Sequence, residues 1–541
     1  MKNLTGYIFL LAVIFLAACQ NASPTPPITA VPTTTDIPAG AGIETAVPAT
    51  LPSPTSVPTE TAVPVEPADQ TLFNWNDPAI YRSGLTANAQ DSLDLLSSRP
   101  VYSITLAIDP AAATVSGTAQ IRYTNSETVP LDKVYLHLFP NLLGGAIEID
   151  NVAVDGQEAG WLYEGPNDSM LRVELADALP PGEQVVLAMD FTTAVPQSLG
   201  RNYGVFAQVD DVMALAHFYP MVAVYDDEGW HTAPPVEFGD PTFADASFYL
   251  VTLTAPSEQV IAGSGVVVGE EDDSRMQTVT MAAGPARDFY LALSPNYAIE
   301  TVETGSTTIR SYAPAKFAAG ARQAAEAAAN ALEVYGTRLG AYPYTELDIV
   351  ATPTQALGIE YPGIIAITQR EYDPDDPLSA NVPNSVYLES TVAHEMGHQW
   401  FYNVVGNDQL EEPWLDEALA QYATGLYYLD NYGRAAAQSY ENSWNDRWNR
   451  VNDADIPIGQ PVGAYEGAAY SAIVYGRGPL FVKALAETMG QPTFDTFLKD
   501  YVSTYQWDIA TTEGFQSLAE SHCGCDLTDL FNSWVYENQD K

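Results

Sequence analysis

Hydrophobic and polar residues alternate along the first half of the chain. In the first such run every second residue is apolar, and these residues are Tyr102, Ile104, Leu106 and Ile108. The pattern returns at residues 115–123 and 185–191, and turn signals containing Pro, Asp and Gly separate the runs. A period of two is that of a half-buried β-strand. The pattern therefore predicts an antiparallel β domain, in the form of a sandwich, over residues 95–305.

The periodicity changes in the second half of the chain. Residues 316–338 are rich in alanine and predict a helix, whereas residues 347–351 and 363–368 predict short strands. From Ser385 onward the pattern is mostly helical. Strands followed by helices predict an α+β domain, which we place at residues 306–541.

Residues 1–19 have the features of an export signal. Lys2 precedes an apolar stretch at residues 4–16, and Leu16-Ala17-Ala18-Cys19 resembles the lipobox at which bacterial lipoproteins are cut and lipidated. We therefore expect Cys19 to carry lipid and to anchor the protein in the cell envelope, outside the cytoplasm. An uncleaved membrane anchor is the alternative, but the apolar run is shorter than the about 20 residues of a span. Residues 20–70 are dominated by Pro and Thr, which predicts a disordered spacer.

The chain is strongly acidic, with 69 Asp and Glu residues against 21 Lys and Arg and a net charge of −48. Such a surface repels phosphate, which argues against nucleic acid as a partner. It attracts cationic groups, including the amino termini of peptides. High solubility is the simpler explanation of the same charge.

Cys523 and Cys525 are the only cysteines besides Cys19. If the protein is exported, they meet an environment in which disulfides persist. A structural pair or two free thiols is the expected state. A second metal site that includes the neighbouring His522 is the less favoured alternative.

The richest chemical signal is a pair of histidines four residues apart. On a helix His394 and His398 share one face, and Glu417 follows them in the next predicted helix. Two imidazoles, one carboxylate and a fourth position for water predict a catalytic zinc site with one Zn2+ ion. Glu395 is then placed to act as general base toward the zinc-bound water. The alternative is a pair of surface histidines beside a solvated glutamate.

Residues 394–401, together with Trp414-Leu415-Asp416-Glu417, resemble the zinc aminopeptidases of the aminopeptidase N family, which are gluzincins. The resemblance covers about residues 95–541. It implies a multidomain protein in which an N-terminal antiparallel β-sandwich precedes a thermolysin-like α+β catalytic domain. Two positions depart from the family pattern, since Asp416 stands for Asn and Ala418 for Gly, but neither is a metal ligand.

The resemblance implies further site residues near the carboxyl end. The segment Tyr475-Gly476-Arg477-Gly478 is similar to the family's Tyr-x-Lys-Gly, whose tyrosine stabilises the oxyanion. Tyr475 is therefore expected to be catalytic, and Tyr470 to line the substrate site. Many relatives also carry a large helical C-terminal domain, which we expect to be missing here.

The resemblance also implies a site for the substrate's amino group. Residues 357–363 are similar to the family's Gly-x-Met-Glu-Asn strand, and Glu360 takes the place of the glutamate that binds the free α-amino group. Gly358 lies on the same strand, which can pair with the peptide backbone. The family adds a second acidic residue from its β domain. Asp210 and Asp211 are the nearest candidates, although the expected neighbouring residues are absent.

These features predict a zinc-dependent aminopeptidase that hydrolyses N-terminal residues from peptides outside the cytoplasm. One alternative is a zinc endopeptidase of thermolysin-like fold, in which Glu360 would have no role. The other is a non-catalytic peptide-binding module, for which the complete ligand set gives no support.

Overall fold

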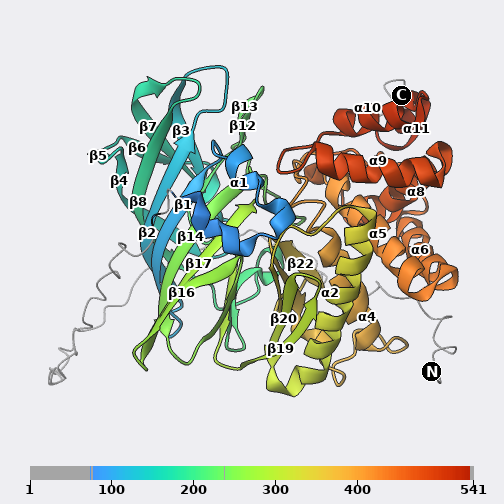
Figure 1. Ribbon diagram of the computed structural model, residues 1–541, viewed down its shortest axis with the longest axis horizontal. Coiled ribbons are helices and arrows are strands. Elements are labelled where there is room, and N and C mark those ends of the chain that lie inside the picture. The colour runs from blue at the N-terminus through green and yellow to red at the C-terminus, as the bar shows by residue number, and fades with distance from the viewer. Residues whose placement is uncertain (1–73, 75–76, 237, 537–541) are drawn as a thin grey trace, which may run out of the picture. The chain divides into compact units, whose positions relative to one another are not determined.

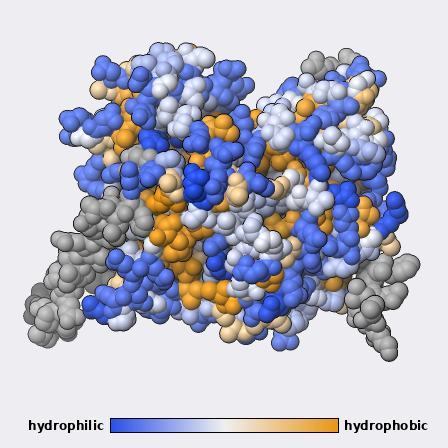
Figure 2. Space-filling view, viewed as in Figure 1, coloured by the Kyte–Doolittle hydropathy of each residue, from blue (hydrophilic) through white to orange (hydrophobic). Residues whose placement is uncertain are grey.

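The computed structural model describes residues 74, 77–236 and 238–536, and all of them belong to one unit of contacting residues. The export signal, the spacer and Cys19 lie outside the described residues. None of the described helices combines the length and the apolarity that crossing a bilayer requires. Figure 2 shows that hydrophilic residues cover most of the visible face, as the acidic composition leads one to expect.

The first domain is built on an eight-stranded sheet (Figure 1). In spatial order its strands are β16 (Val266–Asp272), β17 (Met276–Ala286), β14 (Ser247–Pro256), β1 (Val101–Asp109), β2 (Thr114–Thr124), β8 (Gln184–Ala194), β4 (Ala146–Val154) and β5 (Gln157–Glu158). Neighbouring strands are antiparallel except for β1 and β14, which are parallel. The prediction of an antiparallel domain is wrong at this one pair, because β14 joins the large sheet only after the chain has passed through β9 to β13 of the smaller sheets.

Three smaller sheets complete this domain. One contains β15 (Val260–Gly263), β18 (Leu291–Ser294), β10 (Val212–Leu215) and β9 (Phe206–Val209). Another contains β11 (Met221–Val222), β3 (Leu131–His137), β7 (Met170–Leu179) and β6 (Trp161–Glu164). The last is the hairpin β12 (Tyr225–Asp226) and β13 (Gly229–Trp230).

The residues that alternate in the sequence point into one core, as predicted. Ile104, Leu106 and Ile121 of the large sheet are 3% exposed or less. They belong to the same buried cluster as Val134 of β3 and Met213 of β10. The core therefore lies between the large sheet and the smaller ones, which is the arrangement of a sandwich.

The second domain begins with a five-stranded sheet. Its order is β19 (Tyr297–Thr304), β20 (Thr307–Pro314), β21 (Glu346–Thr352), β23 (Ile364–Thr368) and β22 (Gly358–Tyr361). The strands predicted at residues 347–351 and 363–368 are therefore present. Because β19 pairs with β20, the change of sheet falls between Ser294 and Tyr297, earlier than the boundary expected from the sequence. Strand β22 lies at the edge of the sheet.

Helices form the rest of this domain (Figure 1, yellow to red). They are α2 (Ala318–Arg338), α3 (Gln369–Tyr372), α4 (Asn384–Gly397), α5 (Trp414–Tyr432), α6 (Arg434–Trp448), α7 (Ala469–Ala472), the π-helix η11 (Ile473–Arg477), α8 (Gly478–Met489), α9 (Gln491–Thr504), α10 (Thr512–Cys523) and α11 (Thr528–Trp534). Ahead of β1 lie η3 (Pro78–Gly84), η4 (Ala87–Ala89) and α1 (Ser92–Leu95). Helix α2 confirms the alanine-rich prediction, because its small residues let it pack closely on the sheet and on α4.

Arg287, which follows β17, joins the two domains. Its Nε donates to the carbonyl of Tyr402 at 2.6 Å, and its two terminal nitrogens donate to the carbonyls of Ala244 at 3.0 Å and Asp508 at 2.7 Å. Burial lowers the pKa of this guanidinium to about 10. Gly406 makes room for it, since a β-carbon at that position would lie 2.2 Å from Cζ of Arg287.

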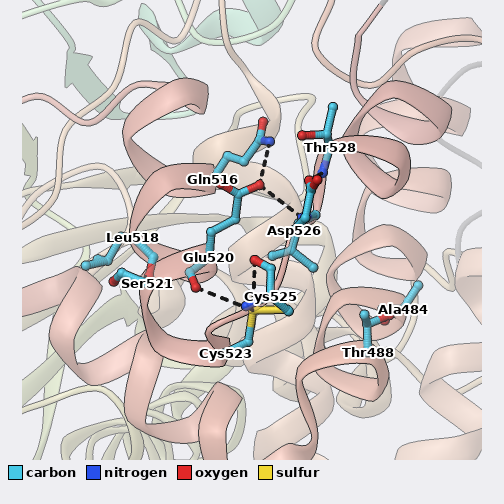
Figure 3. Close-up of a disulfide and its surroundings, with 11 residues drawn as sticks. Ala484, Thr488, Gln516, Leu518, Glu520, Ser521, Cys523, Cys525, Asp526 and Thr528 are labelled. Atoms are coloured by element: carbon cyan, nitrogen blue, oxygen red, sulfur yellow. Dashed lines mark hydrogen bonds between the residues drawn. A yellow bond between two sulfur atoms is a disulfide. The ribbon is translucent and has the colours of Figure 1, made fainter.

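Cys523 and Cys525 form a disulfide at the end of α10, with an S–S distance of 1.98 Å (Figure 3). Gly524 between them adopts a φ of 59°, which glycine reaches without cost. His522 lies 3.1 Å from the carboxylate of Asp500. Of the two expected states, a structural pair or two free thiols, the structure has the pair, and sulfurs joined in this way are not available as metal ligands.

Candidate active site

Three predicted metal ligands converge where α4 ends against α5. Nε2 of His394 lies 3.2 Å from Oε2 of Glu417, and Nε2 of His398 lies 3.5 Å from the same oxygen. Ligands at about 2.0–2.1 Å from a tetrahedral zinc are about 3.3 Å apart. The observed separations therefore fit a single zinc ion bound by these three residues.

The groups around His398 and Glu417 leave their ligand atoms available to bind zinc. Nδ1 of His398 lies 3.1 Å from the carbonyl oxygen of Phe401, so that its proton is held there and Nε2 is left for the metal. Oε2 of Glu417 is buried and has no hydrogen-bond partner among the described residues. Burial raises the pKa of Glu417, but the imidazoles of His398 and His394 lower it more, which keeps this carboxylate ionised.

Glu395 lies on α4 beside the ligands and is 4% exposed. Burial raises the pKa of its carboxyl group well above the usual value, as expected for a group that must accept and release a proton. Strand β22 passes directly over it. A β-carbon at Gly358 would lie 2.4 Å from Oε1 of Glu395, so only glycine lets the strand approach this closely.

Two tyrosines form one wall of the site. The hydroxyl of Tyr475 donates to Oε1 of Glu417, and the ring of Tyr475 lies 6.2 Å from that of His394. The ring of Tyr470 lies 5.7 Å from that of Tyr475. The π-helical turn η11 presents Tyr475 toward the ligands, and such turns are frequent at functional sites. Both tyrosines therefore lie close to the predicted metal ligands.

Glu360 reaches the same place from the edge strand β22. Nε2 of Gln409 donates to Oε1 of Glu360 at 3.2 Å and to Oδ2 of Asp416 at 2.8 Å. Carboxylate oxygens of Glu360 and Asp416 and a ring nitrogen of His398 all lie within 4.8 Å of one another. Asp416, to which the sequence assigned no role, is thus a further carboxyl group beside the metal ligands, and burial together with the carboxylate of Glu417 raises its pKa well above the usual value.

The structure also reveals an acidic residue that the sequence did not single out. Asp240 projects from a β-domain loop, and burial together with the carboxylates of Glu417 and Asp416 raises its pKa well above the usual value. The preceding Phe238 places its ring 5.6 Å from that of Tyr470. The sequence signal for this residue was weak, since Gly239-Asp240-Pro241 reads only as a turn.

Asp210 and Asp211 do not approach the site. They form the turn between β9 and β10, with φ values of 53° and 62°. The carboxylate of Asp211 accepts a hydrogen bond from Asn296 at 3.2 Å on the surface. The expectation that one of these two residues supplies an acid to the site is therefore wrong, whereas Asp240 of the β domain lies in one recess with Glu360.

Comparisons with known proteins agree with this arrangement. Residues 323–534 match the Peptidase family M1 domain. Aminopeptidase M1-B of Oryza sativa subsp. japonica is 26% identical over 456 residues, which cover 80% of this chain and 49% of that protein. Aminopeptidase M1 of Arabidopsis thaliana is 22% identical over 379 residues, covering 65% of this chain and 42% of that protein. The chain thus spans about half the length of the curated relatives it matches.

The fold is shared with solved structures. An M1 zinc metallopeptidase from Deinococcus radiodurans superposes with a TM-score of 0.60 at 19% sequence identity, covering 81% of this chain and 93% of that one. A two-domain M1 zinc metallopeptidase variant bound to L-tryptophan superposes equally well, with a TM-score of 0.60. Residues 323–534 are thus similar to an M1 peptidase domain, and the chain shares the two-domain fold of M1 zinc metallopeptidases.

Proposed function

We propose that this protein is a zinc-dependent aminopeptidase that removes N-terminal residues from peptides. One observation carries the proposal. Glu360 from the catalytic domain and Asp240 from the β domain line one recess, and the carboxylate of Glu360 lies within 4.8 Å of a ring nitrogen of the metal ligand His398. A substrate ammonium group placed between these two carboxyl groups would favour their ionised forms and would set the first peptide bond beside the zinc.

Each residue of the site has a separate role in the proposed reaction. When bound by His394, His398 and Glu417, zinc supplies a Lewis acid for the scissile carbonyl and lowers the pKa of a water ligand. Glu395 accepts the proton of the attacking water and passes it to the leaving amine. Tyr475 donates a hydrogen bond to the oxyanion as its charge develops.

The edge strand β22 would hold the rest of the substrate. One side of this strand pairs with β23, and its other side has no neighbouring strand in the described sheet. An extended peptide can add to such an edge through main-chain hydrogen bonds. Glu360 and Gly358 lie on that strand, so that one element both anchors the amino group and sets the register of the peptide.

Peptides of one sequence with a free or an acetylated amino terminus test the proposal. We expect stepwise release of N-terminal residues from the free peptide and no cleavage of the acetylated one. Internal cleavage of the acetylated peptide would instead establish an endopeptidase. If neither peptide is cut by zinc-loaded protein but both bind, the chain is a binding module.

We further propose that the protein is attached to the outside of a membrane by lipid on Cys19. The lipobox-like segment supports this, and the Cys523–Cys525 disulfide fits an oxidising compartment. Metabolic labelling with a fatty acid should mark the wild type and leave Cys19→Ala unlabelled. Equal labelling of the two would contradict the anchor.

A further inference from the structure

A narrow recess opens beside the two amine anchors. Its lining includes Glu360 and Asp240 themselves, and also Asn202, His217 and Gln409. In an α-amino acid the side chain and the ammonium group share one carbon atom. A substrate anchored through its ammonium group at Glu360 and Asp240 therefore has its first side chain at this recess.

His217 presents a hydrogen-bond acceptor to the recess. It is 2% exposed, and its Nε2 lies 2.9 Å from Oδ2 of Asp288. That same oxygen accepts a hydrogen bond from the hydroxyl of Tyr402 at 2.6 Å. A carboxylate only accepts, so Nε2 donates, and the tautomer with its proton on Nε2 leaves Nδ1 as an acceptor. Nδ1 is buried and unpartnered within the described part of the chain.

The backbone of Tyr402 shows that this arrangement is imposed by its surroundings. Tyr402 has a φ of 114° and His217 a φ of 49°, which are unfavourable for residues with a side chain. Such strain persists where neighbouring contacts enforce it. The hydrogen bonds to Asp288 are such contacts, and they fix the orientation of the imidazole.

Gln409 and Asn202 supply two more acceptors. Nε2 of Gln409 donates to the carboxylates of Glu360 and Asp416, so its Oε1 is fixed as the acceptor end of the amide. Oε1 of Gln409 and Oδ1 of Asn202 are both buried and make no hydrogen bond with any residue that the structure describes. A buried acceptor without a donor is destabilising. The recess thus complements a ligand that brings a donor.

We infer that this recess selects N-terminal residues whose short side chain donates a hydrogen bond, namely serine and threonine. The inference rests on the proposed function for the position of the ammonium group. A hydroxyl can donate to Nδ1 of His217 or to one of the two amide oxygens, whereas valine, with the shape of threonine, leaves all of these acceptors unpaired. The recess has room for little more than one water-sized group, which disfavours the long side chains of lysine and arginine, although both also donate.

Calorimetric binding of free amino acids to zinc-loaded Glu395→Gln protein tests the inference without turnover. We expect L-threonine to bind at least about tenfold more tightly than L-valine, because only threonine satisfies a buried acceptor. Equal or tighter binding of L-valine, tighter binding of L-lysine, or binding of none of them would overturn it. The assay with free and acetylated peptides tests the proposed function separately. A failure of the side-chain preference can therefore be distinguished from a failure of the proposed function.

Substitutions in the recess test which acceptors cause the preference for threonine over valine. His217→Leu and Asn202→Gly each remove an acceptor and should reduce the threonine-to-valine ratio. His217→Gln can still donate to Asp288 and offer an oxygen to the recess, and it should retain the ratio. Asn151→Gly is the matched control, because Asn151 is also at a positive φ, of 54°, but is exposed on the β domain. A ratio unchanged in both acceptor-removing variants would refute the assignment.

Discussion

The backbone of Gly358 lies against the carboxylate of Glu395, so closely that a β-carbon at position 358 would be 2.4 Å from Oε1 and 2.6 Å from Cγ of that side chain. The edge strand that we expect to hold the peptide and the general base are therefore fitted to each other. Any side chain at position 358 must displace one of them.

Gly358→Ala should lower kcat by about 100-fold while zinc stays bound, because the displaced carboxylate no longer meets the attacking water. Steady-state kinetics and metal analysis of the purified protein measure both effects. Gly336→Ala is the matched control, since a β-carbon there, on α2, meets nothing within 4 Å. A kcat within twofold of the wild type would show that the strand and Glu395 are not coupled.

Glu395→Gln should reduce turnover by on the order of 1,000-fold or more, since the amide cannot accept the proton. Zinc content should be unchanged, because Glu395 is not a ligand. Glu389→Gln is the matched control and should retain activity. Glu389 lies on the same helix, where it accepts a hydrogen bond from Tyr427 at 2.8 Å. Full activity in Glu395→Gln would exclude this residue as the base, and full activity after complete removal of zinc would refute the whole mechanism.

Tyr475→Phe should lower kcat by about 100-fold with little change in KM, because the hydroxyl acts on charge that develops only in the transition state. The substitution also removes the hydrogen bond to Glu417, so zinc affinity must be measured alongside. Tyr163→Phe removes a hydroxyl that bonds Ile149 in the β domain, and it controls for general loss of stability. A rise in KM alone would assign Tyr475 to binding.

Asp240→Asn should raise KM for peptides with a free amino terminus by about tenfold, as expected when a charged hydrogen-bond partner of an ammonium group is lost. Asp211→Asn should leave KM unchanged, because Asp211 lies in the β9–β10 turn. The same assay thus separates the residue that the structure identifies from one that the sequence suggested. Equal KM values for the two variants would contradict the role of Asp240.

Asp348 should make stability depend on pH. Burial raises the pKa of its carboxyl group to about 8, although Arg310 lowers it in part. The folded protein therefore keeps a proton that the unfolded chain releases above its ordinary pKa of 3.8. Between these values the contribution of Asp348 to the free energy of unfolding falls by about 1.4 kcal/mol for each rise of one pH unit.

Urea unfolding of Asp348→Asn at pH 5 and pH 7 measures this effect. The stability of the variant relative to the wild type should increase by roughly 2–3 kcal/mol over that interval, given one titrating proton. Asp132→Asn removes an exposed carboxylate of β3 and should follow the wild type. A constant difference between Asp348→Asn and the wild type would rule out a raised pKa.

Local patterns predicted much of this structure because their causes are local. The period of two in the β domain, the alanine-rich helix α2 and the spacing of His394 and His398 all reflect the geometry of single elements. The third ligand, Glu417, could be predicted from its place on the next helix. Such features need no knowledge of how distant segments meet.

The remaining site residues depend on contacts between distant segments. Asp240 reaches the zinc ligands only because the two domains pack together, and nothing in its neighbours marks it. His217 and Asp288 are 71 positions apart, and Tyr402 and Asp288 are 114 apart. The sequence shows that these residues are present, but only the tertiary packing brings them into contact.

The contacts of Arg287 constrain how the two domains can evolve. Its guanidinium holds the carbonyl of Tyr402, four residues beyond the metal ligand His398, as well as the β domain's own Ala244. A β domain exchanged for that of another protein would have to bring an arginine at this place, or the loop behind the zinc ligand would lose its support. The two domains are therefore not interchangeable modules, and recombination between relatives should succeed only when both are inherited together.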